Sequence, residues 1–142
     1  MDTSRLARNL ITTSRLNTDT QPEATMNTAV PSLALVVEDD QFQREMLSDL
    51  LKDEHMEVIA CESAEAAELV LEEVGGSLRV LVTDVELAGT ETGIELAGHA
   101  KRHFPELNVV IISGKDDLSL PPDVHFLKKP WQPLDLLREA MG

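Results

Sequence analysis

The chain has 142 residues, with 12 basic and 26 acidic side chains and a net charge of −14. This length fits one domain with a core of its own, and the negative charge argues against duplex DNA or an anionic membrane surface as a direct partner. The single cysteine, Cys61, excludes an internal disulfide framework. No apolar run approaches the roughly 20 residues of a membrane span, so we expect a cytoplasmic protein.

Charge divides the chain into two parts. Residues 1–30 carry three arginines and three acidic residues, are rich in Thr, Ser and Asn, and have no sustained apolar period. We therefore expect residues 1–31 to be a disordered or flexible extension, in which a helix over Ser4–Thr12 would have little to bury against. Residues 32–142, with 9 basic and 23 acidic residues, should form the folded domain.

From residue 33 onward, strand and helix patterns alternate. Leu33–Val37 is an aliphatic and β-branched run typical of a buried strand, and Gln41–Asp53 carries apolar residues at helical spacing. Glu57–Cys61 predicts a short second strand. Ser63 is a good N-cap for a helix over Ala64–Val74, which a pair of glycines ends.

The second half continues the alternation. Leu78–Thr83 predicts a third strand, and Gly93–His103 predicts a helix with one apolar face. Asn108–Ile112 and Val124–Leu127 predict the fourth and fifth strands. Pro133 suits the first turn of a final helix that runs through Met141.

Five strands that alternate with helices predict an α/β fold, because a parallel sheet needs crossover helices on both faces. Right-handed crossovers favour a flavodoxin-like, doubly wound, five-stranded parallel sheet with the order 2-1-3-4-5. One helix is missing from the pattern. Residues 113–123 contain a Pro-Pro pair and leave room for about one helical turn, so the fourth helix should be rudimentary or absent.

Charged and polar side chains follow four of the predicted strands. Glu38 and Asp39 follow the first strand, Asp84 the third, Ser113 the fourth and Lys129 the fifth. The carboxyl ends of parallel strands open on one edge of a sheet, where ligands bind. The sequence therefore predicts a pocket that combines carboxylates, a hydroxyl group and an ammonium group.

This combination suits phosphoryl transfer assisted by Mg²⁺. Mg²⁺ prefers oxygen ligands and needs only one or two carboxylates, which Asp39 and Asp84 can supply, with Glu38 holding a coordinated water. An aspartate carboxylate can attack phosphorus, and Lys129 and Ser113 can contact the phosphoryl oxygens. A lone acidic residue after a strand is more often a helix N-cap than a ligand, and we interpret Asp40 in that way.

Four segments together resemble the receiver domain of two-component response regulators, and the resemblance covers roughly Leu33 to Met141. The matching segments are Leu35-Val36-Val37-Glu38-Asp39-Asp40, Leu81-Val82-Thr83-Asp84, Val110-Ile111-Ile112-Ser113-Gly114 and Phe126-Leu127-Lys128-Lys129-Pro130-Trp131.

The resemblance implies a role for each metal-site residue. Asp84 takes the position of the phosphoacceptor, and Glu38 and Asp39 take that of the acidic pair, with Asp39 as the direct Mg²⁺ ligand. The backbone carbonyl of Glu86 completes the ligands contributed by the protein. All four residues, Glu38, Asp39, Asp84 and Glu86, are thus implied to surround the metal.

The resemblance also implies a switch and its partners. Ser113 takes the switch hydroxyl position, Lys129 that of the family's lysine and Phe126 that of the switch aromatic residue. A phosphohistidine on a sensor histidine kinase or a histidine phosphotransfer protein would donate to Asp84, and the aspartyl phosphate would later hydrolyse. The protein would catalyse its own phosphorylation and dephosphorylation and would not be an enzyme acting on other substrates.

Two departures from the family shape the expected output. Ser113 and Lys129 lie 16 residues apart, several fewer than is usual in the family, whose fourth helix commonly serves dimerisation. We therefore expect a monomer or weak dimer. No effector domain follows Gly142, which predicts a single-domain receiver that contacts a downstream protein, still unidentified, or acts as a phosphate relay or sink.

Two other functions fit parts of the pattern. One is a phosphorylation-independent protein-binding module on the same fold. The other is a toprim-type phosphoesterase that uses Glu38, Asp84 and Glu86, but this leaves Lys129 unexplained. A separate hypothesis is that Glu86 and Lys115 pair across the pocket mouth and shield the phosphoryl group from water; the favoured alternative is two separate, solvated side chains. Trp131 should lie near the same pocket.

Overall fold

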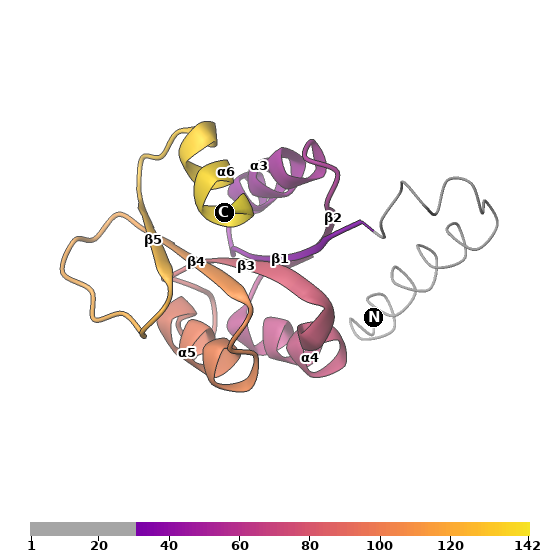
Figure 1. The fold of residues 1–142 in the computed structure, drawn as a ribbon. Helices are drawn as coiled ribbons and strands as arrows, with labels where there is room; N and C mark the ends of the chain where they lie inside the picture. The colour runs from indigo at the N-terminus through magenta and orange to yellow at the C-terminus, as the bar shows by residue number, and fades with distance from the viewer. Residues whose placement is uncertain (1–30) are drawn as a thin grey trace, which may run out of the picture.

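The computed structural model describes residues 31–142. They form one five-stranded parallel sheet with the order β2-β1-β3-β4-β5, with helices covering both of its faces (Figure 1). This confirms the predicted flavodoxin-like fold. The predicted flexible extension lies outside the described residues, except for Pro31.

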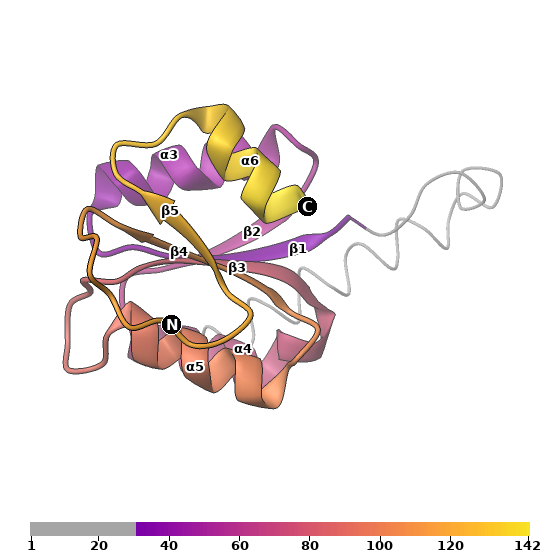
Figure 2. The ribbon, with the colours of Figure 1, turned by 60° about the vertical axis from the view of Figure 1, so that its left-hand side comes forward.

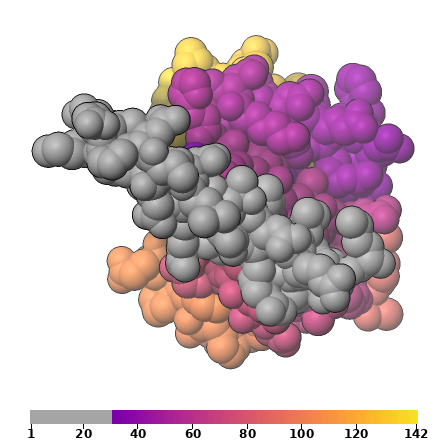
Figure 3. Space-filling view, turned by 90° about the vertical axis from the view of Figure 1, so that its right-hand side faces the viewer, coloured from indigo at the N-terminus to yellow at the C-terminus, as the bar shows by residue number. Residues whose placement is uncertain are grey.

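The helices α3 and α6 cover one face of the sheet, and α4 and α5 cover the other (Figures 1 and 2). Figure 3 shows another face of the domain, on which the purple residues early in the domain lie above the pink residues that follow them in the sequence. The strands are β1 (Leu33–Val37), β2 (Glu57–Cys61), β3 (Leu78–Asp84), β4 (Asn108–Ser113) and β5 (His125–Lys128). The helices are α3 (Gln41–Lys52), α4 (Ala64–Val74), α5 (Gly93–His103) and α6 (Pro133–Met141), with a 3₁₀ turn over Gly75–Ser77.

Burial on both faces explains the continuous apolar runs of the central strands. All five residues of β1 are buried, and they alternate between two cores. Leu35 and Val37 belong to the core beneath α4 and α5, whereas Ala34 and Val36 belong to the core beneath α3 and α6. A strand with helices on both faces has no solvent side, so both sets of side chains are apolar.

The predicted caps are confirmed, and they set where each helix begins beside the site edge. Asp40 caps α3, its Oδ1 accepting from the backbone N–H of Gln43 at 2.9 Å. Ser63 caps α4 by accepting from the N–H of Ala66 at 3.1 Å. Each oxygen satisfies a first-turn N–H that has no partner within its helix.

Three strands end one residue beyond the prediction. Asp84, Ser113 and Lys128 are still within their ladders, because Asp84 is in register with Ile112 and Ser113 with Lys128. Parallel pairing extends each strand while a neighbour remains alongside. The consequence is functional, since Asp84 and Ser113 are held by the sheet itself and not by a loop.

The connection between β4 and β5 contains no helix, as predicted. Residues 114–124 cross the edge as irregular chain, and Leu118, Leu120 and Val124 pack from it against the core beneath α4 and α5. Three apolar contacts thus replace a helix over this part of the sheet. Within residues 31–142, every helix is too short or too polar to cross a membrane.

Candidate active site

The carboxyl edge of the sheet gathers the polar residues that the sequence singles out. Glu38 directly follows β1, Asp84 ends β3, Ser113 ends β4 and Lys129 directly follows β5. Glu38, Asp84 and Ser113 are 2%, 7% and 3% exposed, respectively. Buried polar groups are costly unless they are paired, and within residues 31–142 every buried side-chain nitrogen or oxygen has a hydrogen-bond partner.

Asp84 is held through both of its carboxylate oxygens. The ammonium group of Lys129 donates to Oδ2 at 2.7 Å, and the backbone N–H of Glu86 donates to Oδ1 at 3.2 Å. Burial lowers the pKa of Lys129, but the hydrogen bond and charge of Asp84, with the charges of Glu38 and Glu86, outweigh it, so the net pKa is raised. The ammonium group of Lys129 is therefore stabilised in its charged form against the carboxylate of Asp84.

Glu38 is the buried member of the acidic pair. Its pKa is raised to about 8: burial is the main cause, hydrogen bonds to Asp39 and Asp84 and the charge of Asp84 also raise it, and the N–H of Asp40 lowers it. That N–H donates to Glu38 Oε2 at 3.2 Å. Asp39 itself is exposed. Crowded carboxylates of this kind hold a proton or attract a cation.

The oxygen donors fit a hard divalent cation. Within residues 31–142, no three side chains of His, Cys, Asp or Glu form a complete metal-binding set. Mg²⁺ does not require one, because it keeps several waters and takes one or two carboxylates. Asp39, Asp84 and the backbone carbonyl of Glu86 are the groups that would hold such an ion. Burial first, and then the neighbouring carboxylates Asp39 and Asp84, raise the pKa of Glu38 beside them.

Ser113 and Lys115 form the opposite wall. The Ser113 Oγ accepts a hydrogen bond from the backbone N–H of Lys115 at 3.1 Å, and a hydroxyl group that accepts one bond still has a proton to donate. The Lys115 ammonium group lies 3.1 Å from Glu86 Oε1. The hypothetical pair is thus present, although two separate, solvated side chains were favoured, and both side chains are largely exposed.

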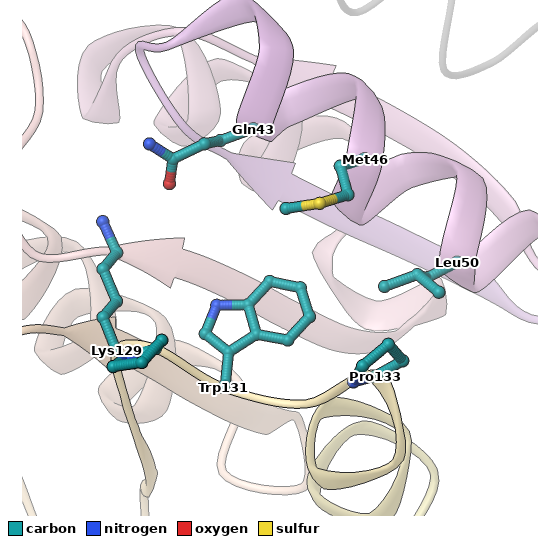
Figure 4. Close-up of a pocket in the computed structure, with 7 residues that line it drawn as sticks. Gln43, Met46, Leu50, Lys129, Trp131 and Pro133 are labelled. Atoms are coloured by element: carbon teal, nitrogen blue, oxygen red, sulfur yellow. The ribbon is translucent and has the colours of Figure 1, made fainter.

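Two aromatic residues lie where the sequence placed them. Trp131 lines a groove together with Lys129 (Figure 4), and the ammonium group of Lys129 contacts Asp84. Phe126 lies on β5, half-buried against the core beneath α4 and α5.

Two supporting residues were missed by the sequence reasoning. A Cβ atom on Gly93 would lie 1.8 Å from the carbonyl oxygen of Asp84, so the start of α5 can approach Asp84 this closely only without a side chain. Arg44 donates from Nη1 to the carbonyl oxygens of Glu38 and Asp39 at 2.9 and 3.3 Å. The only signal for Gly93 was a glycine at a helix start, and Arg44 had no signal beyond its charge.

Comparison with known proteins identifies the family. The profile of the response regulator receiver domain matches residues 34–140. This chain belongs to that family. The receiver is 39% identical over 118 residues to the response regulator protein FleR of Pseudomonas aeruginosa, covering 76% of this chain and 24% of FleR. It is 34% identical over 110 residues to a cyclic di-GMP phosphodiesterase of Thermotoga maritima, covering 73% of this chain and 28% of that protein.

A solved structure agrees on the fold. The receiver superposes on a response regulator receiver protein from Sinorhizobium medicae with a TM-score of 0.72 and 24% identity, covering 78% of this chain and 92% of the other. By contrast, the receiver spans only about a quarter of the length of the curated relatives that it matches. The similarity therefore concerns the receiver domain and not the whole of those proteins.

Proposed function

We propose that the receiver takes a phosphoryl group onto Asp84 from a phosphohistidine of a sensor histidine kinase or histidine phosphotransfer protein, with Mg²⁺ bound by Asp39, Asp84 and the carbonyl of Glu86. The observation that carries this proposal is the 2.7 Å contact of the Lys129 ammonium group with a buried Asp84 carboxylate. An ion pair with a purely structural role would not need the further carboxylates of Glu38 and Asp39 beside it.

In this reaction an Asp84 carboxylate oxygen attacks phosphorus as the phosphorus–nitrogen bond breaks. The bonding electrons return to the imidazole nitrogen of the donor. The Lys129 ammonium group shifts from the carboxylate to a phosphoryl oxygen, and the Ser113 hydroxyl group donates a hydrogen bond to another. Bound Mg²⁺ would supply positive charge against the phosphoryl oxygens, and Glu38 would hold one of its waters. Water later attacks the aspartyl phosphate and releases inorganic phosphate.

The proposed signal leaves through the face beside β4 and β5. Movement of Ser113 toward the phosphoryl group would shift the hydrogen bond from the Lys115 N–H and favour an inward position of Phe126. Because this connection has no helix, a downstream protein would read irregular chain and the edge of β5. We propose a cytoplasmic receiver that signals by contact or relays phosphate, as a monomer or weak dimer, with residues 32–142 as its domain.

The direct test is to incubate the full chain with MgCl₂ and acetyl phosphate and to measure its intact mass. The proposal predicts a gain of one phosphoryl group that EDTA abolishes and that Asp84→Asn does not show. An unchanged mass for the wild-type chain, while its fold is intact by circular dichroism, would instead favour the phosphorylation-independent binding module.

A further inference from the structure

An open groove lies between α3 and the chain that joins β5 to α6. Its volume is about 560 Å³. Figure 4 shows Met46 and Leu50 projecting from α3 toward Trp131 and Pro133 on the other wall, with Lys129 at one end. The walls are mainly apolar.

The groove belongs to a longer apolar stripe on α3. Phe42, Met46 and Leu50 follow one another at intervals of four residues, and Phe42 and Met46 are 75% and 39% exposed. A second hollow of about 330 Å³ borders the same stripe on its other flank. That flank is acidic, because Glu45, Asp49 and Asp53 also recur at intervals of four.

This surface specifies the chemistry of its occupant. A contiguous exposed apolar surface on a small domain marks a binding site more often than it marks chance. A helix with apolar side chains at intervals of three or four residues fits such a groove, and the acidic flank favours basic residues beside them. A second copy of the chain fits poorly, because a two-fold pairing would place the acidic flanks close together.

The chain itself contains a segment with this chemistry. Residues 4–15 have Leu6, Leu10 and Ile11 at helical spacing and include Arg5, Arg8 and Arg15, with no acidic residue among them. On a helix, Arg8 and Arg15 would lie on the flank next to Ile11, so the apolar face and the basic flank would lie side by side. This arrangement mirrors the paired apolar and acidic stripes of α3.

The tether is long enough for this segment to reach the groove. Residues 16–32 form 17 residues of polar chain, with a typical end-to-end distance of about 23 Å if flexible. Helix α3 has 12 residues and is therefore about 18 Å long. A tether of this length gives the segment an effective concentration in the mM range, so weak binding would suffice.

We propose that residues 4–15 bind as an amphipathic helix along α3, with Leu6 and Leu10 in the groove against Trp131 and with the arginines beside the acidic flank. The bound segment would lie next to Lys129, whose ammonium group holds Asp84. The binding itself does not depend on phosphorylation.

Trp131 is the only tryptophan, so its fluorescence reports on the groove directly. In the full chain, Leu10→Asp should red-shift the emission and raise acrylamide quenching by about twofold, because a tethered segment at mM effective concentration would no longer cover the ring. Thr20→Asp is the matched control, since it adds the same charge in the tether and should leave the emission unchanged. Asp84→Asn should behave as wild type, which separates this test from that of phosphorylation.

A charge exchange tests the acidic flank. Arg8→Glu should expose Trp131, and Asp49→Lys in the same chain should restore its protection, a coupling that loss of folding cannot mimic. Equal quenching of wild type and Leu10→Asp would overturn the proposal. Protection that depends on protein concentration, with a dimer in sedimentation, would overturn it in favour of a second copy.

Discussion

The pocket at the carboxyl edge of the sheet and the connection that follows Ser113 are adjacent, but they differ in the burial of their charged side chains. In the pocket, Asp84 is buried and both of its oxygens are bonded. In the connection, the ion pair of Lys128 with Asp116 joins two exposed side chains. The proposed chemistry therefore depends on buried groups whose substitution would cost much stability. Substitution of the exposed surface that would carry the signal would cost little.

The largest effect is expected for Lys129→Met. It removes the cation from the buried carboxylates Asp84 and Glu38, and breaking such a pair should cost about 2–3 kcal/mol of unfolding free energy at pH 7. Urea unfolding in EDTA measures this, since no added cation then replaces the ammonium group. The control Lys128→Met breaks an exposed pair and should cost less than about 0.5 kcal/mol. Equal costs would remove the contrast between the two regions.

Gly93→Ala should come next. Its Cβ atom would meet the Asp84 carbonyl oxygen at 1.8 Å, so α5 or the end of β3 must move, at about 1–3 kcal/mol. Phosphorylation by acetyl phosphate should slow in the same variant, because the carboxylate moves with its backbone. Gly76→Ala is the control, since a Cβ there meets nothing within 4 Å. A normal phosphorylation rate in Gly93→Ala would show that the close approach does not position Asp84.

Substitution of Glu91, in the loop between β3 and α5, tests whether negative charge at the edge of the site is left uncompensated. Burial, the hydrogen bond and charge of Glu68, and the charges of Glu65 and Glu95 raise its pKa to about 7. A raised carboxyl pKa contributes stability that is present below about pH 4.5 and is lost as the pH rises through about 7. Because the side chain is only partly buried, screening reduces the effect to about 1 kcal/mol.

Glu91→Gln should therefore be more stable than wild type by about 1 kcal/mol at pH 8, with the difference vanishing near pH 4.5. Thermal unfolding at both values checks this. Glu72→Gln, on an exposed position of α4, should shift stability by less than about 0.5 kcal/mol. A gain for Glu91→Gln that is the same at both pH values would contradict the assigned cause.

The smallest effect concerns the mouth of the pocket. Lys115→Ala removes the 3.1 Å contact with Glu86 and should speed hydrolysis of the aspartyl phosphate by about two- to threefold, which is the scale of an exposed ion pair. The decay of intact phosphorylated mass in EDTA, after donor removal, measures this rate. Lys128→Ala should leave the rate unchanged. If Lys115→Ala also leaves it unchanged, the pair does not shield the phosphoryl group.

Much of the structure of this receiver could be predicted, because the sequence patterns that specify it involve residues close together in the chain. The strand over Leu33–Val37 and the caps Asp40 and Ser63 depend on neighbours within a few residues, where period and capping chemistry suffice. The strand ends also located Asp84 and Lys129 at one edge, since parallel strands share a direction. The absence of a helix between β4 and β5 could also be predicted, because Pro121 and Pro122 lack the backbone N–H donors that a helix needs.

The remaining features depend on contacts between distant parts of the chain. Lys129 reaches Asp84 across 45 positions of sequence, at a distance that only the strand order and register define. Gly93 meets the backbone of Asp84 because α5 packs against β3, and the raised pKa of Glu38 comes from its burial among other carboxylates. The groove against α3 exists because α6 and Trp131 leave part of that helix uncovered. Local pattern specifies which groups occupy an edge, but packing specifies their distances, and the chemistry depends on both.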